Sequence, residues 1–264
     1  FNYLLVNLFG SKIYLDKNSN YKNIKKEKNI IISNHVTIFD TLIYFIEICY
    51  TGVINEFCLK KQVSYLPGIG WWCKILKFPI LSRSKKDLLL LENHQTTNSI
   101  LIYPEGTRYT KKKYKEAKIF AKKNNFNLSD YTLLPKTGGV YTLNKIKDVK
   151  NIIISFLIYL DKNNMIINTT EKVIYPKKIL IQKKVFPIDQ VPKDRDEFKK
   201  WIQNQFYQIN QIKKECTSTP NKISESYIKQ NFKEINIVNY QLGFMVLLIS
   251  WFGMFVIKKT LTYI

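Results

Sequence analysis

Arginine is almost absent from this strongly basic chain. Of the 42 Lys and Arg residues among 264, only three are Arg: Arg83, Arg108 and Arg195. A guanidinium is a planar fork that can bind an anion through two parallel hydrogen bonds, whereas a lysine ammonium is a point charge. A sequence that nearly always uses Lys has therefore kept Arg where the fork matters, which indicates anion recognition at Arg108 and, as a second candidate, at Arg83.

Cysteine is also scarce. The four cysteines form no CxxC pair, and three of them lie in apolar surroundings, where Cys behaves as a small buried hydrophobic residue. This pattern predicts a reducing compartment and no structural metal site. The positions are Cys49, Cys58, Cys73 and Cys216.

The formal charge of +22 raises the question of a nucleic-acid partner. The lysines are scattered through nearly every segment, and we find no basic helix, RNP-like motif or zinc-ligand spacing beside them. We therefore expect no nucleic-acid role. Attraction to an anionic membrane face or to a polyanionic co-substrate explains the charge better.

Residues 29–216 alternate between strand-like and helix-like patterns. Such alternation predicts an α/β domain with a mostly parallel central sheet flanked by helices. The expected strands are 29–33, 56–59, 78–81, 99–103, 132–134, 151–160 and 178–186, and the expected helices are 38–50, one at Trp71-Trp72, 87–98, 114–123, 139–146 and 194–216.

The two ends of the chain differ from this domain in composition. Residues 1–28 predict a membrane-proximal segment, and the polar residues 217–234 predict a linker. Residues 235–264 are hydrophobic: from Ile235 to Ile257 no charge occurs in 23 residues, so we expect a transmembrane segment there. A hydrophobic helix folded onto the domain is the alternative. The chain begins at Phe1 rather than Met, and we expect it to be a fragment or a processed product.

Two short signatures carry the chemistry, Asn34-His35-Val36-Thr37-Ile38-Phe39-Asp40 and Tyr103-Pro104-Glu105-Gly106-Thr107-Arg108. Residues five apart face different sides of a continuous helix or strand, so His35 and Asp40 can meet only where a strand end turns into a helix start. Such a pair would fix the tautomer of the imidazole and stabilise the imidazolium form.

Each signature is short and occurs by chance. Asp40 alone is more often a helix cap, and a Pro-Glu-Gly turn is common at strand ends. In the second signature Gly106 permits close approach of the backbone to a ligand. Glu105 either holds the guanidinium of Arg108 or faces the substrate, and the sequence leaves both open. His94, the only other histidine, lies in a polar stretch with no evident partner, and we expect it at the surface.

Two weaker blocks accompany the signatures. Arg83 follows the strand expected at 78–81, and Lys136 follows the strand expected at 132–134 and precedes Gly138-Gly139 at a helix start, where an anion is favoured. Four blocks in this order, each at the end of a strand, form a strong signal, because ligands of parallel sheets bind at the carboxyl ends of the strands.

In this order the blocks resemble those of the glycerolipid acyltransferases related to 1-acylglycerol-3-phosphate acyltransferase. The resemblance runs from about residue 9 to residue 207. Cys58-Leu59-Lys60 and Pro67-Gly68-x-Gly70-Trp71 are similar to the branch that contains lysophosphatidic acid and lysocardiolipin acyltransferases. Thr41 departs from that branch, in which many members carry Trp at this position.

The resemblance implies an enzyme that transfers a fatty acyl chain from acyl-CoA to the free hydroxyl of a lysophospholipid. Lysophosphatidic acid is the leading acceptor, and lysocardiolipin or lysophosphatidylinositol is the alternative. His35 would be the general base and Asp40 its partner. The implied substrate contacts are Arg83, Glu105, Gly106, Thr107 and Arg108, with Lys60 and Lys136 as further anion contacts.

The resemblance implies neither a metal nor a bound cofactor, since acyl-CoA is a co-substrate. The implied partners are acyl-CoA, a lysophospholipid and the membrane bilayer, and the implied location is the endoplasmic reticulum membrane, with a mitochondrial membrane as the alternative. A non-catalytic membrane protein that binds anionic lipid through its lysines is the hypothesis from another class.

Overall fold

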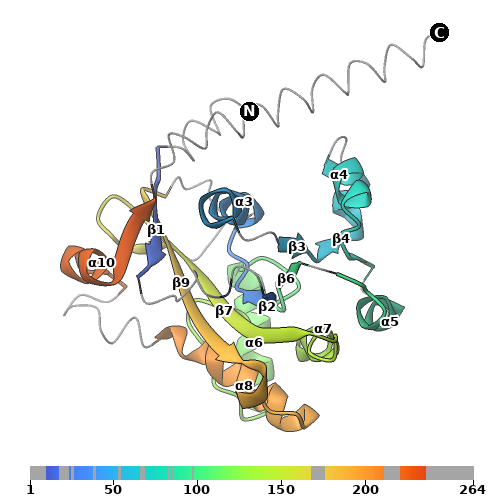
Figure 1. Cartoon of the computed structure of the whole chain (residues 1–264). Coiled ribbons are helices and arrows are strands. Elements are labelled where there is room, and N and C mark those ends of the chain that lie inside the picture. Colours follow the sequence, from blue (N-terminus) through green and yellow to red (C-terminus); the bar gives the residue numbers. More distant parts are fainter. Residues whose placement is uncertain are drawn as a thin grey trace.

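One mixed sheet with helices on both faces organises the chain (Figure 1). The computed structural model describes residues 10–17, 24, 27–37, 40–52, 55–65, 69–82, 84, 86–96, 98–167, 176–210 and 221–235. Within these ranges the strand order is β10-β1-β9-β7-β2-β6-β3, and β8 pairs with β7. The bounds are β1 (Lys12–Asp16), β2 (Lys28–Ser33), β3 (Asn55–Phe57), β6 (Ser99–Ile102), β7 (Val149–Leu160), β8 (Ile166–Ile167), β9 (Lys178–Pro187) and β10 (Phe232–Ile235).

The half of the sheet from β7 to β3 is parallel. β2 pairs in parallel with both β6 and β7, and β3 pairs in parallel with β6. On the other side β1 pairs in parallel with β9. Both β8 and β9 pair antiparallel with β7, and β10 pairs antiparallel with β1. The predicted α/β fold with a mostly parallel central sheet is thereby confirmed.

Alternation along the central strands explains how both faces of the sheet are covered. In β2, Ile30 and Ile32 belong to one buried cluster and Ile31 to the other. Helix α3 (Asp40–Thr51) packs on the Ile31 side, and α7 (Thr137–Leu143) and α8 (Arg195–Tyr207) pack on the opposite side (Figure 1). The sheet edge at the carboxyl end of β2 thus lies between two layers of helices.

A small excursion separates β3 from β6. It contains β4 (Leu59–Lys60), the 3-10 helix η1 (Lys61–Tyr65), α4 (Ile69–Ile75), β5 (Ile80–Leu81) and α5 (Lys86–Glu92), and β4 pairs in parallel with β5. The strand expected at 56–59 is therefore divided between two sheets, and the helix expected at 87–98 ends at Glu92. Helix α6 (Lys111–Lys123) follows β6, close to its expected position.

The strand expected at 132–134 is absent, although these residues are described. Thr132 and Leu133 are buried, as a strand would be, but the N–H of Leu133 donates to the Glu105 side chain at 3.1 Å. The fourth block of the sequence therefore does not follow a strand.

The predicted boundaries of the domain were too narrow. β1 falls within the segment expected to be membrane-proximal, and α10 (Glu225–Asn231) and β10 fall within the expected linker. β10 pairs with β1, and the Lys12 ammonium lies 3.1 Å from the Glu234 carboxylate across that pair. An edge strand carries polar side chains on its exposed positions, which is why β10 resembles a linker in sequence.

The predicted transmembrane segment at 235–264 lies outside the described residues, apart from Ile235, and so do residues 1–9 of the N-terminal segment. Among the residues that the structure does describe, no helix combines the length and hydropathy that a membrane span requires.

A buried ion pair joins α3 to β9. The Lys183 ammonium contacts Glu47 Oε1, and both side chains are essentially inaccessible to solvent. Burial lowers the pKa of Lys183, and the Glu47 charge opposes that shift. The other oxygen, Glu47 Oε2, has no hydrogen-bond partner in the described part of the protein. Removing the Glu47 carboxylate from water therefore costs free energy that its contact with Lys183 does not fully offset.

We predict that Lys183→Met lowers the free energy of unfolding by about 3–5 kcal/mol, because it leaves the Glu47 carboxylate buried and unpaired. The double variant Lys183→Met/Glu47→Leu should recover most of this loss, since no buried charge remains. Urea unfolding of the three proteins measures the effect. A double variant no more stable than the single one would show that packing, not the unpaired charge, controls this site.

Candidate active site

The side chain of Asp40 is the centre of a dense set of hydrogen bonds at the start of α3. It is fully buried. Its Oδ2 lies 2.8 Å from Nδ1 of His35 and accepts the N–H of Val36 at 2.7 Å. Its Oδ1 accepts the N–H and the hydroxyl of Thr37, both at 2.9 Å, and the hydroxyl of Tyr159 at 2.6 Å. The expected contact between His35 and Asp40 is confirmed.

The imidazole of His35 is held in one orientation by two neighbours. Nδ1 faces Asp40, and the ring stacks on Tyr103 with centroids 4.5 Å apart. The Tyr103 hydroxyl lies 3.4 Å from the hydroxyl of Thr41. Among the described residues Nε2 has no hydrogen-bond partner, and 16% of the His35 side chain is exposed. Nε2 is therefore the nitrogen that can take a proton from a bound molecule.

Asn34 fixes the loop that carries His35. Its side-chain Nδ2 donates to the carbonyl of Leu157 at 3.0 Å, and its Oδ1 accepts the N–H of Leu157 at 2.8 Å. The amide thus imitates a peptide group and extends the pairing of β2 with β7 by one position beyond Ser33. This pairing sets where the chain leaves the sheet.

Glu105 joins the two signatures through their backbone. Its side chain is buried; Oε1 accepts the N–H of His35 and Oε2 the N–H of Leu133, each at 3.1 Å. The N–H of Tyr109 donates to the carbonyl of His35 at 2.9 Å, so the second loop holds His35 on both sides. Burial raises the pKa of Glu105 well above its usual value, although the two N–H groups oppose the shift.

This placement differs from one of the two alternatives that the sequence left open, the pairing of Glu105 with Arg108. Glu105 and Arg108 are both described and form no ion pair, and the Glu105 carboxyl is buried against the backbone of His35 and Leu133. The structure thus gives Glu105 a role in positioning His35, and the substrate contact implied for it stays a prediction.

The turn after Glu105 brings a cation close to exposed backbone. Gly106 has φ +67°, a conformation that glycine adopts without strain. A Cβ built on Gly106 would lie 3.9 Å from Nζ of Lys136. The backbone N–H of Lys136 donates to the carbonyl of Pro104 at 2.8 Å. Lys136 and Arg108 are exposed, and Thr107 is half-buried. The structure thus brings Lys136 to the second signature, without the strand that was expected to place it.

The predicted contact Arg83 lies outside the described residues. Lys60 is in β4, within the excursion that follows β3. Its place near the carboxyl end of β3 puts it at the same sheet edge as His35, in a separate small sheet.

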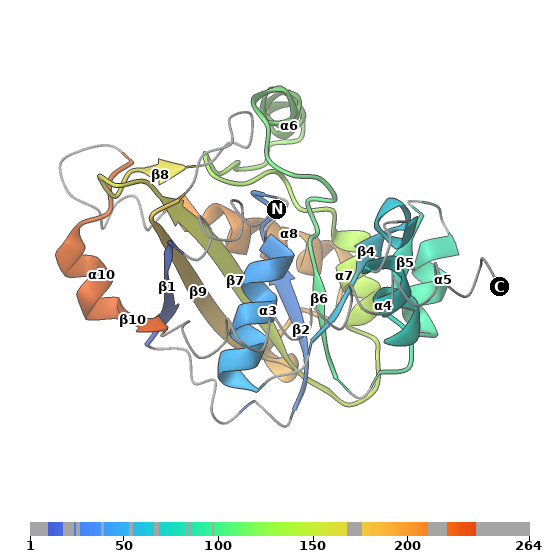
Figure 2. The ribbon, with the colours of Figure 1, turned by 90° about the horizontal axis from the view of Figure 1, so that it is seen from above.

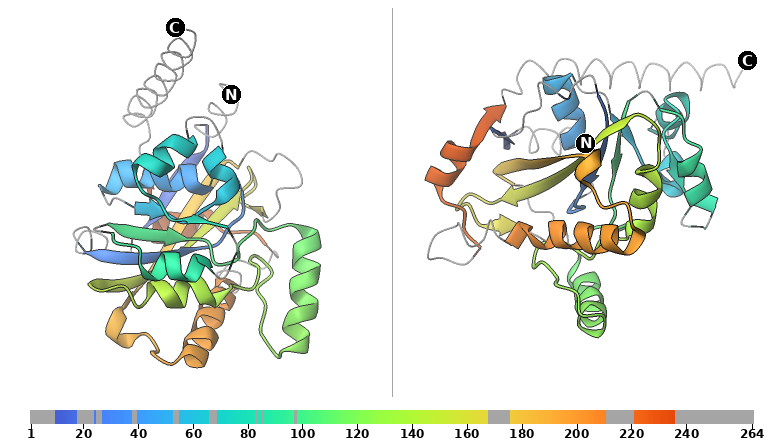
Figure 3. Two further views of the ribbon diagram at one scale, coloured as in Figure 1. Left: turned by 90° about the vertical axis from the view of Figure 1, so that its right-hand side faces the viewer. Right: turned by 60° about the horizontal axis from the view of Figure 1, so that its bottom comes forward.

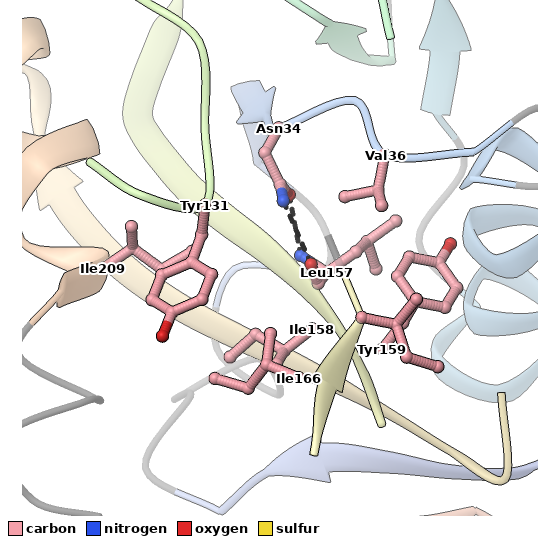
Figure 4. A pocket seen from close by; sticks show the side chains of 9 residues that line it. Asn34, Val36, Tyr131, Leu157, Ile158, Tyr159, Ile166 and Ile209 are labelled. Carbon is pink, nitrogen blue, oxygen red and sulfur yellow. Dashed lines mark hydrogen bonds between the residues drawn. The ribbon is translucent and has the colours of Figure 1, made fainter. Parts of the chain in front are cut away.

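A small apolar pocket adjoins the His35 loop (Figure 4). Asn34 and Val36, which flank His35, form part of its wall together with Tyr159. Figure 4 shows aliphatic side chains from β7 and β8 in the lining, together with Tyr131 and Ile209. Besides Asn34, Val36 and Tyr159, the lining residues are Tyr131, Leu157, Ile158, Ile166, Ile167 and Ile209.

The sequence missed two tyrosines of the site. Tyr103 opens the second signature and ends an expected strand, and Tyr159 lies in an apolar run, but neither was predicted to contact the His35–Asp40 pair. The one available signal was chemical: a tyrosine in an aliphatic strand needs a partner for its hydroxyl. Burial and the Asp40 charge raise the pKa of Tyr159 well above its usual value, so the hydroxyl keeps its proton and donates.

The expectation for His94 was wrong. Its Nε2 lies 2.6 Å from Glu56 Oε2, and only 12% of its side chain is exposed. Glu56 also accepts hydrogen bonds from Thr96 and Asn98. This second histidine–carboxylate pair lies near the amino end of β6, away from His35, and it ties β3 to the segment before β6.

Comparison with known proteins agrees with the geometry. Residues 17–143 match the family model described as Acyltransferase. The chain is 28% identical to lysocardiolipin acyltransferase 1 of Gallus gallus over 223 residues, which cover 77% of the chain and 57% of the relative. It is 23% identical to 1-acyl-sn-glycerol-3-phosphate acyltransferase delta of Bos taurus over 220 residues, covering 78% of the chain and 57% of the relative.

A solved structure shows the same fold. It is that of the 1-acyl-sn-glycerophosphate (LPA) acyltransferase PlsC from Thermotoga maritima, with a TM-score of 0.52, 15% identity, and coverage of 82% of this chain and 81% of that one. The resemblance drawn from the sequence is confirmed, because residues 17–143 match the acyltransferase family model. It matches 57% of the length of the two curated relatives named above.

The raised pKa of Glu105 predicts a dependence of stability on pH. Above the ordinary pKa of a Glu carboxyl, about 4.3, the unfolded chain releases this proton and the folded protein keeps it. Glu105 therefore contributes most to stability below that pKa, and the contribution is lost as pH rises toward the folded pKa.

We expect the free energy of unfolding of the native protein to fall relative to Glu105→Gln between pH 4 and pH 7, because the amide does not titrate. Urea unfolding across this range measures the difference. Glu116→Gln on the exposed surface of α6 is the control, and it should not show this decline. A constant difference between native protein and Glu105→Gln would contradict the raised pKa.

Proposed function

We propose that this acyltransferase domain transfers a fatty acyl group from acyl-CoA to the free hydroxyl of a lysophospholipid, with lysophosphatidic acid as acceptor and phosphatidic acid as product. The observation that carries the proposal is the His35–Asp40 pair at the carboxyl edge of the sheet. Nδ1 of His35 lies 2.8 Å from the Asp40 carboxylate, and Nε2 of His35 has no hydrogen-bond partner among the described residues. A base of this kind suits the removal of a proton from a hydroxyl near neutral pH.

The proposed acyl transfer uses the His35–Asp40 geometry in the following way. His35 Nε2 takes the proton of the acceptor hydroxyl while the oxygen attacks the carbonyl carbon of the thioester. The carbon–sulfur bond then breaks, and the imidazolium gives its proton to the departing thiolate, so that the products are the diacyl lipid and CoA with a free thiol. Asp40 stabilises the imidazolium by its charge. A thioester is already activated, so base catalysis and positioning suffice.

Cations near the second signature support a phosphate-bearing acceptor. Arg108 is exposed and has no ion pair within the described residues, so its guanidinium is available for two parallel bonds to a phosphate. Lys136 lies over Gly106, where the backbone is open to close approach. We assign the main phosphate contact to Arg108, with Lys136 and Arg83 as further contacts.

A second acceptor is favoured by one comparison, because the relative from Gallus gallus is named a lysocardiolipin acyltransferase. Lysophosphatidylinositol is the other acceptor considered. We further propose that the enzyme works at a membrane, that of the endoplasmic reticulum or, alternatively, of mitochondria, since both the acceptor and the product are membrane lipids. A non-catalytic lipid-binding protein would not need the His35–Asp40 pair.

The first test is a panel assay of the purified protein with several lysophospholipids and acyl-CoAs, in which release of the free thiol of CoA is measured. We expect the highest kcat/KM with lysophosphatidic acid. His35→Ala should lower kcat by about 10²–10⁴-fold, the usual loss when a general base is removed.

His94→Gln is the matched control, because it alters the only other histidine and should leave kcat nearly unchanged. Normal turnover by His35→Ala would remove the base assignment. Absence of thiol release by the native protein with every acceptor of the panel would contradict the proposed function.

A second test concerns Tyr159. Tyr159→Phe removes one donor from Asp40, and we expect kcat to fall by about tenfold, because the carboxylate loses a contact that fixes its orientation against His35. The carboxylate then keeps more negative charge for the imidazolium, so the acidic limb of the kcat/KM profile should move to higher pH.

Tyr44→Phe provides the comparison for Tyr159→Phe. The Tyr44 hydroxyl is also buried, but it lies 2.7 Å from Ser33 Oγ and Ser155 Oγ and does not contact Asp40. Its removal should leave the pH profile in place. If both variants shift the profile equally, a general loss of packing explains the effect and Tyr159 has no positioning role.

A further inference from the structure

Helix α6 stands apart from the sheet on the side of the candidate active site. It begins three residues after Arg108, and the N–H of Tyr109, between them, donates to the carbonyl of His35 at 2.9 Å. Figure 2 and Figure 3 show α6 projecting from the domain, with no other helix packed alongside it in the drawn part of the fold. The helix is thus joined directly to the loop that holds the base.

The two faces of α6 differ in kind. Tyr114, Ala117 and Ala121 lie on one face, at helical spacing, and Ala121 is buried. The Tyr114 hydroxyl donates to Oδ1 of Asp130 at 3.0 Å, so this face attaches the helix to the domain.

Ile119 lies at the centre of the opposite face of α6, and 73% of it is exposed. Phe120 beside it is 55% exposed. Lys115 and Lys123 lie one helical turn before and after Ile119, and both are exposed. Ile119 therefore projects outward between lysines, and Phe120, about 100° further round the helix, is partly covered by Phe126, with ring centroids 6.4 Å apart.

The charge of α6 is concentrated. Seven of its thirteen residues are Lys, and its single acidic residue, Glu116, pairs with Lys113 at 2.8 Å. The expectation that the lysines are scattered without a basic helix is wrong for this segment. A helix that only faced water would need neither the excess of lysine nor exposed Ile119 and Phe120 between those lysines.

We propose that α6 docks the domain onto an anionic lipid surface. Lysines attract the negative charge of such a surface, while Ile119 and Phe120 enter the boundary between headgroups and acyl chains. A soluble polyanion would complement the lysines but would leave both apolar side chains in water. The functional consequence rests on the proposed function: docking through α6 turns the sheet edge with His35 toward the membrane that holds the lysophospholipid.

The test compares binding of the full chain to phosphatidylcholine vesicles with and without phosphatidic acid, at low and high salt. The ratio of the two partition coefficients isolates the electrostatic contribution, because an apolar anchor elsewhere in the chain acts on both vesicle types. We expect Lys115→Glu/Lys123→Glu to lower this ratio by at least about tenfold. Ile119→Ser should weaken binding to the anionic vesicles by a smaller factor that salt does not change.

The matched control is Lys147→Glu/Lys150→Glu, which makes the same change of charge near the amino end of β7, at the opposite edge of the sheet. It should leave the ratio unchanged. Hydrogen exchange of residues 111–123 in the native protein is an independent readout, and it should slow with anionic vesicles but not with neutral ones. An unchanged ratio in the α6 variant, an equal loss in the control, or unchanged exchange would overturn the docking surface.

Acyl transfer to a short-chain, monomeric lysophosphatidic acid separates docking from chemistry. With this acceptor Lys115→Glu/Lys123→Glu should keep the native kcat/KM, whereas with vesicle-bound acceptor it should lose activity. A raised KM for acyl-CoA with the monomeric acceptor would show that α6 binds the phosphates of CoA, against the proposal. If the native protein transfers no acyl group, the proposed function fails, while the vesicle experiments still decide the role of α6.

Discussion

A single buried carboxylate, that of Asp40, sets the geometry on which the candidate site depends. A charge without solvent must be matched by hydrogen bonds, and Asp40 receives them from the backbone and side chains of His35, Val36 and Thr37 and from Tyr159. Most of these donors come from the residues that link β2 to α3. The chain must therefore turn around the carboxylate, and this turn determines where the imidazole points.

The second signature acts on the same turn from the other side. Glu105 accepts the backbone N–H of His35, and the backbone N–H of Tyr109 donates to the carbonyl of His35. The loop after β6 therefore fixes the backbone of His35, which lies in the loop after β2. β2 and β6 are parallel neighbours, which brings both loops to one edge of the sheet. This explains why two motifs about seventy residues apart in sequence form one site.

Much of this arrangement follows from local sequence. The β-branched run at β2 predicts a buried strand, and the strand-to-helix turn after it is the one geometry in which His35 can reach Asp40. The role of Glu105 could not be predicted, because it depends on Leu133. That residue belongs to a buried apolar segment typical of a strand, yet its N–H bonds to a side chain in place of a strand neighbour. The local hydrophobic pattern predicts which residues are buried, but it does not predict the hydrogen-bond partner of each backbone N–H and carbonyl group.

The other omissions have similar causes. Tyr159 meets Asp40 only through the pairing of β2 with β7, which joins residues about 120 apart. β10 lies at the edge of the sheet, so polar side chains hide its pairing with β1. Lysine counts over the whole chain hide the dense charge of α6, since the surrounding sequence is also rich in lysine.

The tautomer of His35 tests the central claim most directly. Nitrogen NMR of the protein labelled in histidine shows two imidazoles, because the chain has only His35 and His94. We expect the neutral ring of His35 to carry its proton on Nδ1, bound to Asp40, with Nε2 unprotonated, and we expect Asp40→Asn to remove this preference. A native His35 protonated on Nε2, with Nδ1 bare, would contradict the account.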